Sequence, residues 1–545
     1  MTAAAAPVAL APFDRTSRSY HQRWWILGVL CLALLIIIVD NSILNVAIPT
    51  LVRDLHASDS QLQWIVDAYT LVFAGLLLTA GSLGDRFGRR GALQLGLTVF
   101  GIGSLASALV DTPNQLIFTR GFMGIGGAFI MPATLSIITN TFPPEERGRA
   151  IGMWAAIAGV ATALGPITGG FLLEHFYWGS IFLVNLPIVA VTLTASIMII
   201  PTSKDPSKPA LDFVGAFLSI VGLVALVYGF IQAPVSGWSS PEILLSFGIA
   251  IVVLGAFAIW ENTCKSPMLD TSFFKNPRFT AASVGIMLLF FALFGSIFLL
   301  TQYLQFVMGY SPLIAGCALL PMAVTMLIVA PTSARIVERI GTKLVVGTGL
   351  SLTGLGLILF ATVPAQNISY WGDIAWRMVI MAAGMGLTMA PATESIMGSL
   401  PRAKAGVGSA MNDTTRQVGG AFGVAIIGSV MSSLYGSRVA DAFHNAGITG
   451  APVTEAKKGL GQALAIAANP RVPSEVANQI AAGAKDAFVY GLHRGVLVAA
   501  AAALLGAFIA FRWLPAREAP APDAETAAEV ATDALIADLE VEPAS

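Results

Sequence analysis

Long apolar runs alternate with short polar connections along almost the whole chain. An α-helix needs about 20 mainly apolar residues to cross a bilayer. The pattern predicts an all-α integral membrane protein. The number of predicted spans is even, so both ends of the chain are expected on the same side of the membrane. Fourteen runs are long enough and are predicted to be membrane spans: 25–49, 60–82, 91–110, 114–138, 148–171, 180–200, 211–232, 243–261, 279–304, 312–334, 343–364, 372–398, 406–433 and 492–513.

Lysine and arginine residues are concentrated in alternate connections, and this asymmetry predicts the orientation. Cytoplasmic loops of membrane proteins carry an excess of basic residues. Twenty lysines and arginines lie on the side that holds both termini, whereas the short loops of the other side hold Arg53 alone. Both termini are therefore predicted to be cytoplasmic. The loop at 434–491 holds five more basic residues, but the rule applies poorly to loops of that length.

The composition agrees with a membrane protein. The chain is 56% hydrophobic and only 11% charged, whereas soluble domains carry roughly 25% charged residues. A net charge of −1 without a basic stripe gives no reason to expect nucleic acid. The first apolar run is too long for a signal-peptide core, so we expect it to be retained. The three cysteines are far apart and form neither a disulfide framework nor a metal-binding spacing: Cys31, Cys264 and Cys317.

Two short patterns recur in the second half of the chain in the same order. "GDRFGRR" (84–90) is matched by "VERIGTK" (337–343) at an offset of 253, and "MPATLSI" (131–137) by "APATESI" (390–396) at an offset of 259. Parallel repeats of six spans are the plan of one class of secondary transporters, whose substrate site lies near the bilayer midplane between the halves. The repeat predicts two six-helix bundles with two extra spans between them.

The predicted organisation has five segments. The loop at 434–491 carries two amphipathic stretches separated by "NPRVP" and is predicted to form an extracellular helical hairpin. The tail is rich in alanine, proline and acidic residues, a composition typical of disorder. The segments are a cytoplasmic N-terminal segment (1–24), an N-terminal six-helix bundle (25–200), two inserted spans (201–262), a C-terminal six-helix bundle (263–513) and a disordered acidic cytoplasmic tail (514–545).

Three ionisable residues are predicted to lie at a similar depth in the first bundle: Asp40, Asp67 and Arg120. Charged residues inside spans pair with one another or face a watery cavity, and they mark substrate and proton pathways. We therefore predict proton coupling at Asp40 and Arg120, although a static Asp40–Arg120 ion pair is the alternative. Asp67 has no evident partner and is the best candidate for contact with a cationic substrate. Asn45 and Tyr69 complete the predicted substrate-contacting set in this bundle.

The second half has fewer charges inside its spans. Asp413 and Arg416 are three residues apart on one predicted helix, so an intrahelical salt bridge is as good an interpretation of Asp413 as a proton or substrate site. Glu394, near the cytoplasmic end of its span, is added to the proton-coupling set. An aromatic row could hold flat cations by cation–π contacts, although ordinary lipid-facing or packing phenylalanines are the alternative. The row is Phe290, Phe294 and Phe298, with Gln302 one turn further on.

Two stretches are predicted to control conformational change. "GSLGDRFGRRG" (81–91) places an acid beside three arginines at a helix end, which predicts a charge latch that closes in one conformation. "GVATALGPITGG" (159–170) contains a GxxxG pair and a proline, which predict close helix packing and a bend. The predicted gating residues are Gly81, Asp85, Arg86, Gly88, Arg89, Arg90, Gly165, Pro166, Gly169, Gly170 and, in the second copy, Glu338, Arg339 and Gly341.

These motifs resemble those of the major facilitator superfamily. "GSLGDRFGRR" looks like its signature loop between spans 2 and 3, "LIFTRGFMGIGGA" (116–128) is similar to its span-4 motif, and the 159–170 stretch is similar to the span-5 motif of its exporters. "VDNSILNVAIP" (39–49) and "QWIVDAYTLVFA" (63–74) resemble the first two spans of its fourteen-span drug:proton antiporters. The resemblance implies a multidrug or quaternary-ammonium exporter in the cell membrane, and it implicates Asp413 in proton or substrate handling.

The leading functional interpretation is export of lipophilic, cationic drugs, dyes or antiseptics by alternating access, driven by the proton gradient. No GxxxxGK[ST] loop is present for ATP, so no cofactor is expected. The expected partners are small molecules, protons and the lipid bilayer, with the chain acting as a monomer. The alternative is export of an endogenous lipid, siderophore or antibiotic. An enzyme is not expected, because all five histidines lie in loops or at span edges and no HExxH or GxSxG motif occurs.

Overall fold

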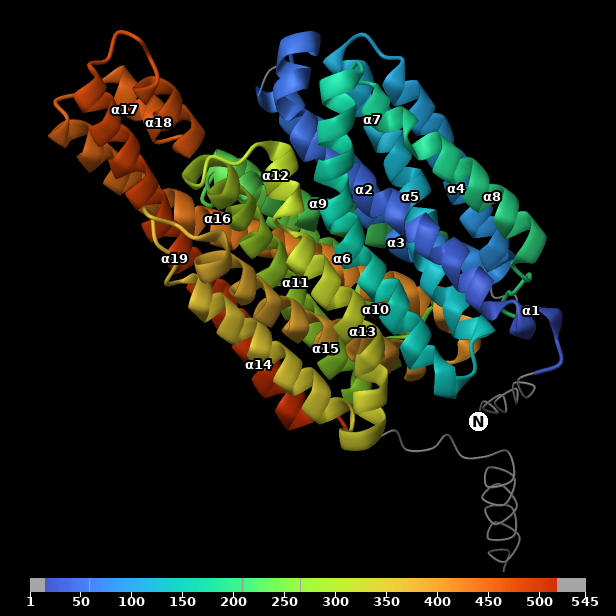
Figure 1. The fold of residues 1–545 in the computed structure, drawn as a ribbon. Helices are drawn as coiled ribbons and strands as arrows, with labels where there is room; N and C mark the ends of the chain where they lie inside the picture. The colour runs from blue at the N-terminus through green and yellow to red at the C-terminus, as the bar shows by residue number, and fades with distance from the viewer. Residues whose placement is uncertain (1–14, 58, 207–209, 265, 517–545) are drawn as a thin grey trace, which may run out of the picture.

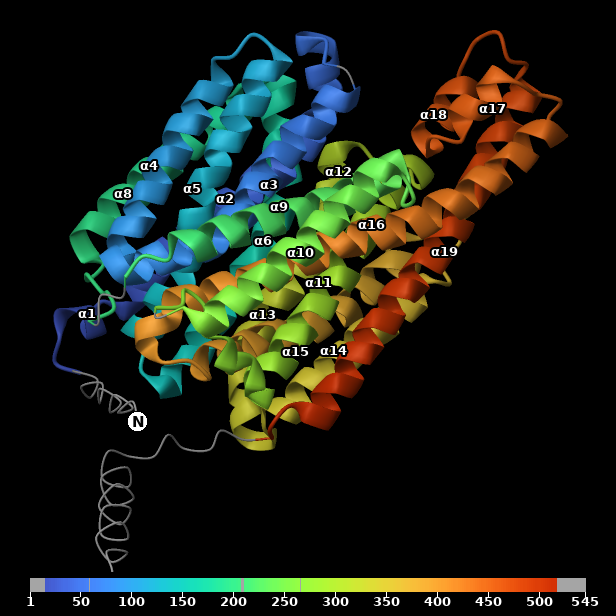
Figure 2. The same cartoon turned by 180° about the vertical axis from the view of Figure 1, so that it is seen from behind.

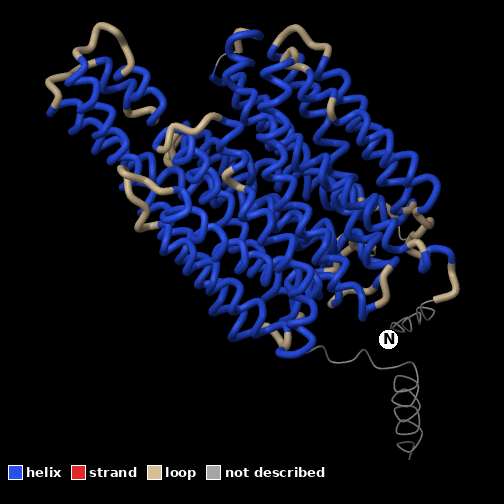
Figure 3. Tube along the Cα trace, viewed as in Figure 1, coloured by secondary structure: helices blue, strands red, loops and turns tan. Residues whose placement is uncertain are grey.

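The protein is a bundle of long helices that run roughly side by side (Figure 3). The computed structural model describes residues 15–57, 59–206, 210–264 and 266–516, and the described residues contain no β-strand. Fourteen of the described helices are long and apolar enough to cross a membrane. The predicted all-α membrane fold with fourteen spans is therefore confirmed. The cytoplasmic placement of the termini stays a prediction.

The helices start where the sequence provides caps. Helix α5 (Pro113–Thr141) begins with a capping box, in which the Thr112 side chain accepts the Gln115 N–H and the Gln115 side chain accepts the Thr112 N–H. Ser240 caps α10 (Pro241–Thr263) by accepting the Ile243 N–H, and Asn276 caps α11 (Pro277–Gln302) by accepting the Arg278 N–H. Proline fits the first turn because that backbone position lacks a hydrogen-bond acceptor within the helix. The polar connections thus fix the helix ends, while the apolar runs fix the helix lengths.

The first group of helices forms one side of the molecule, coloured blue to teal in Figure 1. α2 packs against α5, α6 and α8, and α5 packs against both α3 and α4. Between α6 and α8 lies one short helical turn, α7. The group consists of α1 (Arg18–His21), α2 (Arg23–Leu55), α3 (Asp59–Phe87), α4 (Arg89–Ala108), α5 (Pro113–Thr141), α6 (Pro144–His175), α7 (Ser180–Leu183) and α8 (Asn185–Ile199).

The second group forms the other side, coloured yellow-green to red in Figure 1. α11 packs against α15, α16 and α19, and α14 packs against α15 and α19. π-helical turns at Tyr303–Val307 and Tyr370–Ala375 and 3₁₀ turns at Thr271–Lys275 and Arg402–Lys404 adjoin these helices. The helices are α11 (Pro277–Gln302), α12 (Pro312–Cys317), α13 (Leu320–Ile340), α14 (Thr342–Phe360), α15 (Trp376–Gly398), α16 (Ala405–Asn445), α17 (Ala451–Ala456), α18 (Leu460–Ala467) and α19 (Ser474–Trp513).

Two helices separate the groups along the chain and touch both of them. α9 (Phe213–Ser236) pairs with α10 (Pro241–Thr263) and also packs against α3 and α16. Figure 2 shows this pair crossing the face of the molecule that is hidden in Figure 1. The Trp238 indole N–H at the end of α9 donates to Ser429 of α16 at 2.9 Å. The inserted helices therefore bridge the two groups. The exact segment boundaries predicted from sequence remain predictions.

The region predicted to be a helical hairpin projects beyond the rest of the bundle (Figure 1). α16 and α19 both continue past the length of a span, and the short helices α17 and α18 connect their ends. The stretch "SEVANQIAAGAKDAFVYGL" is helical but continuous with the last span, so no break separates it from that span. Most of the predicted N-terminal segment (1–24) and of the predicted tail (514–545) lies outside the described residues, which begin at residue 15 and end at residue 516.

Candidate transport site

Asp40 lies at the centre of a buried polar cluster in the first group of helices. Arg120 of α5 donates to the Asp40 carboxylate at 2.5 Å, and both side chains are fully buried. Asn185 at the start of α8 donates to the other Asp40 oxygen at 2.9 Å and to Ser104 at 3.0 Å. Because each group comes from a different helix, the carboxylate of Asp40 holds α2, α5 and α8 together.

Arg120 has further partners besides Asp40. Its guanidinium donates to the Asn41 side-chain oxygen and to the Ile65 carbonyl, each at 3.3 Å. It also lies 4.5 Å from the centre of the Tyr69 ring, which is buried and stacks on Phe73. Tyr69, predicted to contact substrate, is therefore a packing partner of the ion pair in this conformation. Loss of the Asp40 charge would leave Arg120 with neutral acceptors.

Asp67 lies level with this cluster but on another face of α3. Ile65 and Tyr69 of the same helix contact Arg120, which fixes the depth. The Asp67 side chain is buried, and it accepts a 3.5 Å hydrogen bond from Gln232 of α9. No ion pair to Asp67 occurs among the described residues. The depth agrees with the sequence interpretation, but the contacts place Asp67 against the inserted helices, away from Asp40 and Arg120.

A second buried cluster lies between the two groups of helices. Arg416 of α16 lies 3.7 Å from Asp413 and donates to the Thr393 hydroxyl at 2.8 Å. Its guanidinium also lies 5.0 Å from the ring centre of Trp154 and 5.2 Å from that of Phe290. Trp154 belongs to α6 of the first group, so this central cluster crosses the interface. The intrahelical Asp413–Arg416 salt bridge exists, but one Asp413 oxygen has no hydrogen-bond partner among the described residues.

The phenylalanine row does not form a continuous stack. Phe290 is buried near Arg416, and its ring meets Phe294 edge-on at 5.4 Å. Phe294 and Phe298 are 39% and 45% exposed, and no ring contact joins Phe298 to Phe294 in the described structure. Gln302 ends α11 and is half-buried. Only Phe290 is therefore part of the central cluster. The side chain of Asn45 is not among those described.

The loop at 81–91 joins the two groups at the predicted cytoplasmic end. The Asp85 carboxylate accepts hydrogen bonds from the backbone N–H of Gly406 at 2.8 Å and of Val407 at 3.0 Å, in the first turn of α16. A carboxylate is favourable there because the N-terminus of a helix carries partial positive charge and unpaired N–H groups. Arg89 binds Asp85 at 2.6 Å and also donates to the carbonyl oxygens of Arg402 and Ala403.

The other residues of this loop hold Asp85 and Arg89 in position against α16. Gly81 packs so closely on α16 that an added Cβ would lie 2.6 Å from the Gly406 carbonyl oxygen. Gly88 has a φ of +121°, a conformation that favours glycine. Arg90 donates to the Ile200 carbonyl, and Arg86 lies over the Phe87 ring. The loop is therefore held to its own bundle by Arg90 and to the other bundle by Asp85 and Arg89.

A further ion pair and the close packing of Gly152 join the two groups of helices at the same end. Arg147 of α6 lies 3.7 Å from Glu394 of α15. Gly152 of α6 packs so closely on α13 that an added Cβ would lie 2.5 Å from the Ala330 carbonyl oxygen. Glu394, predicted to couple protons, therefore belongs to an ion pair between the bundles. With the Asp85 contacts, these features describe a conformation closed at the predicted cytoplasmic end.

The span-5 motif packs against two neighbours. A Cβ at Gly165 would clash with Ser42 of α2, and Gly169 lies against Ile43 of the same helix. The GxxxG pair thus serves the α2–α6 contact. Pro166 and Gly170, in contrast, lie against α12 of the other group, next to Gly316 and Leu313 respectively. The motif therefore contacts α2 in its own group of helices and α12 in the other group.

The second copy of the loop makes no equivalent latch. Glu338 and Arg339 are exposed, and the described structure contains no hydrogen bond or ion pair from them to the first group. Gly341 adopts a φ of +85° at the turn between α13 and α14, as Gly88 does in the first copy. The position equivalent to Arg89 is Thr342, whose backbone N–H bonds to the Ala516 carbonyl. The sequence repeat therefore preserves the turn but not the charge contacts.

Four residues that contact the predicted site residues were not singled out from the sequence. Asn185 and Gln232 bind the buried acids Asp40 and Asp67, Trp154 stacks on Arg416, and Arg147 pairs with Glu394. The one available signal was a polar amide inside an apolar run, which applies to Asn185 and Gln232. Trp154 and Arg147 carried no distinguishing pattern.

The chain is similar to proteins of known families over nearly its full length. Residues 30–424 match the family model of the Major Facilitator Superfamily. Multidrug efflux pump LfrA of Mycolicibacterium smegmatis is 35% identical over 503 residues, covering 91% of this chain and 98% of that protein. Methyl viologen resistance protein SmvA of Salmonella typhimurium is 33% identical over 493 residues, covering 89% and 96%. The crystal structure of the human organic anion transporter MFSD10 (TETRAN) has a TM-score of 0.59 at 14% identity, covering 89% and 98%, which concerns the fold alone.

Proposed function

The chain belongs to the major facilitator superfamily, and from that premise we propose that it is a proton-coupled exporter of lipophilic, cationic drugs, dyes or antiseptics. The superfamily is one of membrane transporters and not of enzymes, and the fourteen spans make this chain a multi-pass protein of the cell membrane. Transport by a monomer, driven by the proton gradient without a cofactor, is part of the proposal.

The similarity to named efflux proteins supports drug export. The relatives are named for multidrug efflux and for resistance to methyl viologen, a flat organic dication. Similarity at 35% identity over 91% of the chain extends through the inserted helices and both bundles. A shared architecture of this extent favours export of organic cations over uptake of polar metabolites.

The buried charges support a cationic substrate. Asp40 and Asp413 each have an arginine within 4 Å, whereas the only partner of Asp67 among the described residues is the amide of Gln232. A charge inside the membrane without a partner is unfavourable by at least ~2.5 kcal/mol. A bound cation would supply the missing charge, so Asp67 is proposed as the substrate-contacting acid.

The proposal that transport is coupled to protons rests on the buried cluster around Asp40. Its carboxylate links three helices through Arg120 and Asn185. Protonation would remove the charge that holds Arg120, which retains acceptors on Asn41 and Ile65. A proton bound at Asp40 would thus weaken the link between α2 and α5 without leaving Arg120 unpaired. Asp413, with one oxygen free of hydrogen bonds, is a second candidate proton carrier.

Asp40→Asn is the direct test. We expect this variant to reach the membrane at the wild-type level and to lose protonophore-sensitive ethidium efflux from cells. Asp54→Asn is the matched control, because Asp54 lies on the same helix and pairs with Arg53 at the surface. Its efflux should equal that of the wild type. Retained efflux in Asp40→Asn would remove Asp40 from the mechanism, and dependence on ATP instead of the gradient would overturn the coupling proposal.

A further inference from the structure

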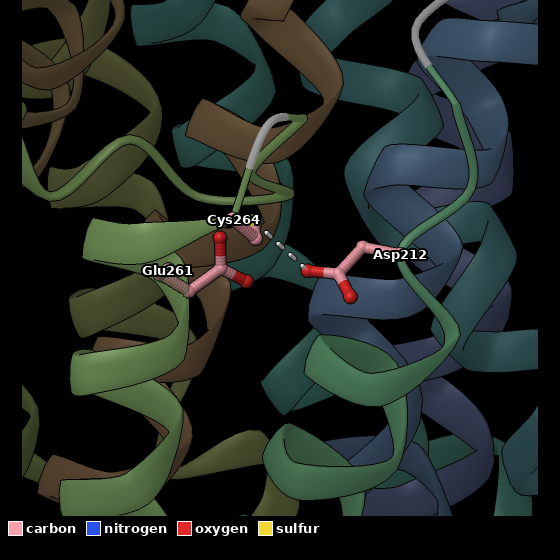
Figure 4. A group of neighbouring side chains, drawn as sticks. All are labelled: Asp212, Glu261 and Cys264. Atoms are coloured by element: carbon pink, nitrogen blue, oxygen red, sulfur yellow. Dashed lines mark hydrogen bonds between the residues drawn. The ribbon is translucent and has the colours of Figure 1, made fainter.

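Three potential metal ligands meet where the two inserted helices come together. Asp212 precedes α9, Glu261 lies in the last turn of α10, and Cys264 directly follows α10. Figure 4 shows the three side chains converging from these two helix ends. One ligand atom from each residue lies within 4.8 Å of the others. The spacing of the cysteines gave no indication of this group, because its other two members are acids and Asp212 lies 52 residues before Cys264 in the sequence.

Asp212 is held in a fixed position. One carboxylate oxygen caps α9 by accepting the Gly215 N–H at 2.7 Å. The indole N–H of Trp260 donates to both oxygens, at 2.9 and 3.1 Å, and the Cys264 thiol lies 3.8 Å from one of them. Outer hydrogen bonds of this kind orient carboxylate ligands of metal ions. The role of Asp212 as a helix cap is enough to explain its position. The argument for a metal site therefore depends on Glu261.

Glu261 is the residue that a helix cap does not explain. Its side chain is 97% buried, since only 3% of its surface is exposed. One oxygen accepts the Leu269 N–H at 3.1 Å, whereas the other oxygen has no hydrogen-bond partner among the described residues. A buried carboxylate oxygen without a partner carries a desolvation cost that a bound cation would offset. The carboxyl group of Glu261 faces Asp212 and Cys264 (Figure 4).

Gly215 leaves room between the two acids. A Cβ added at Gly215 would lie 2.3 Å from an Asp212 oxygen and 2.7 Å from the unpaired Glu261 oxygen. The backbone of α9 can therefore lie this close to both carboxylates only because position 215 has no side chain. Asp212 and Cys264 are only half-buried, so an ion could reach the group from solvent.

We propose that Asp212, Glu261 and Cys264 bind one divalent cation of the zinc type. Zinc accepts thiolate and carboxylate ligands together, at about 2.3 and 2.0–2.2 Å, in tetrahedral geometry. Ligand atoms around such an ion lie roughly 3.5 Å apart, so the side chains close by about 1 Å on binding. Water supplies the fourth ligand. The ion would tie the end of α10 to the start of α9, independently of the transport reaction proposed above.

Cobalt(II) titration of the purified, metal-free full-length protein tests the proposal. Cobalt bound to a thiolate produces a charge-transfer absorption band in the near ultraviolet that oxygen ligands do not produce. We expect one cobalt ion per chain with this band, and added zinc should abolish it. Glu261→Gln should weaken cobalt binding at least tenfold, and Cys264→Ser should lack the band.

Cys317→Ser is the matched control, since Cys317 is exposed and does not belong to the group. It should retain the band with wild-type affinity. Elution of each variant as a single species on size-exclusion chromatography, with unchanged helical circular dichroism, shows that the variants are folded. Absence of the band in the folded wild-type protein would overturn the proposal and leave the acids as a pair that shares a proton. Persistence of the band in Cys264→Ser would overturn it as well.

Discussion

Three carboxylates buried in spans differ in their neighbours. Asp40 has Arg120 and Asn185, and Asp413 has Arg416, whereas Asp67 has only Gln232 within the described part of the chain. Burial of a charge is favourable only where partners compensate its lost hydration. The two paired acids can therefore persist in the resting conformation, while Asp67 is the acid to which we propose that a cationic substrate binds.

Substrate charge should therefore determine the effect of Asp67→Asn. We expect about a tenfold loss in the transport of methyl viologen, equivalent to roughly 1.4 kcal/mol of binding free energy, and less than a twofold loss for a neutral substrate. Drug efflux from cells, measured over a panel of charged and neutral compounds, provides the comparison. Glu174→Gln, at an exposed acid on α6, should change neither. Equal losses for both classes of compound would argue against substrate contact.

The sequence was sufficient to predict the depth of these residues but not their directions. Span lengths and orientation placed Asp40, Asp67 and Arg120 at one level, because the rise per residue of a helix is fixed. The face that Asp67 presents depends on where α9 packs, and no repeat in the sequence covers the inserted helices. Asn185 was missed because a neutral amide in a span gives a weak signal beside an acid or an arginine.

Helix α6 contacts the second bundle along most of its length. Gly152 meets the backbone of α13, Gly159 meets Met326, and Gly170 meets Leu313. Small residues allow backbones to approach closely where lipid provides no hydrophobic driving force between helices. The sequence motif identified only the outer part of this contact, because Gly152 lies in no recognisable pattern.

Gly152→Ala should weaken closure at the predicted cytoplasmic end. Its added methyl group would lie 2.5 Å from the Ala330 carbonyl oxygen and 2.8 Å from the Pro331 Cα, so the helices must separate. Overpacking of this kind is unfavourable by about 1–3 kcal/mol. Spin labels at positions 145 and 335, on exposed ends of α6 and α13, should report a longer distance by pulsed electron paramagnetic resonance. Gly91→Ala, with no atom within 4 Å of the added methyl, should leave it unchanged.

The whole molecule is closed at one end by contacts that the repeat does not duplicate. Asp85 and Arg89 bind the start of α16, whereas Glu338 in the equivalent position is exposed. The repeat correctly predicted two bundles, and the structure adds a positive φ at Gly88 and at Gly341 in the two copies. It could not predict the asymmetry, because the acceptors and donors opposite Asp85 and Arg89 are backbone groups that any sequence provides.

Asp85→Asn should shift the conformational equilibrium toward opening of this end. Hydrogen bonds to charged groups contribute about 1.5–3 kcal/mol each, so the open population should rise by tenfold or more. The same pair of spin labels measures it. Glu338→Gln is the matched control at the equivalent position in the second half, and its distance distribution should equal that of the wild type. A shift of equal size in both variants would contradict a specific latch at Asp85.

The central claim is that a proton bound at Asp40 drives drug movement, and transport by reconstituted vesicles tests it most directly. Purified wild-type protein in proteoliposomes should accumulate methyl viologen against its gradient when a pH difference is imposed. Asp40→Asn should lose this accumulation while still exchanging labelled for unlabelled drug across the membrane. Accumulation by Asp40→Asn, or loss of exchange together with accumulation in the folded variant, would show that Asp40 is a fixed structural partner of Arg120 and would contradict the account.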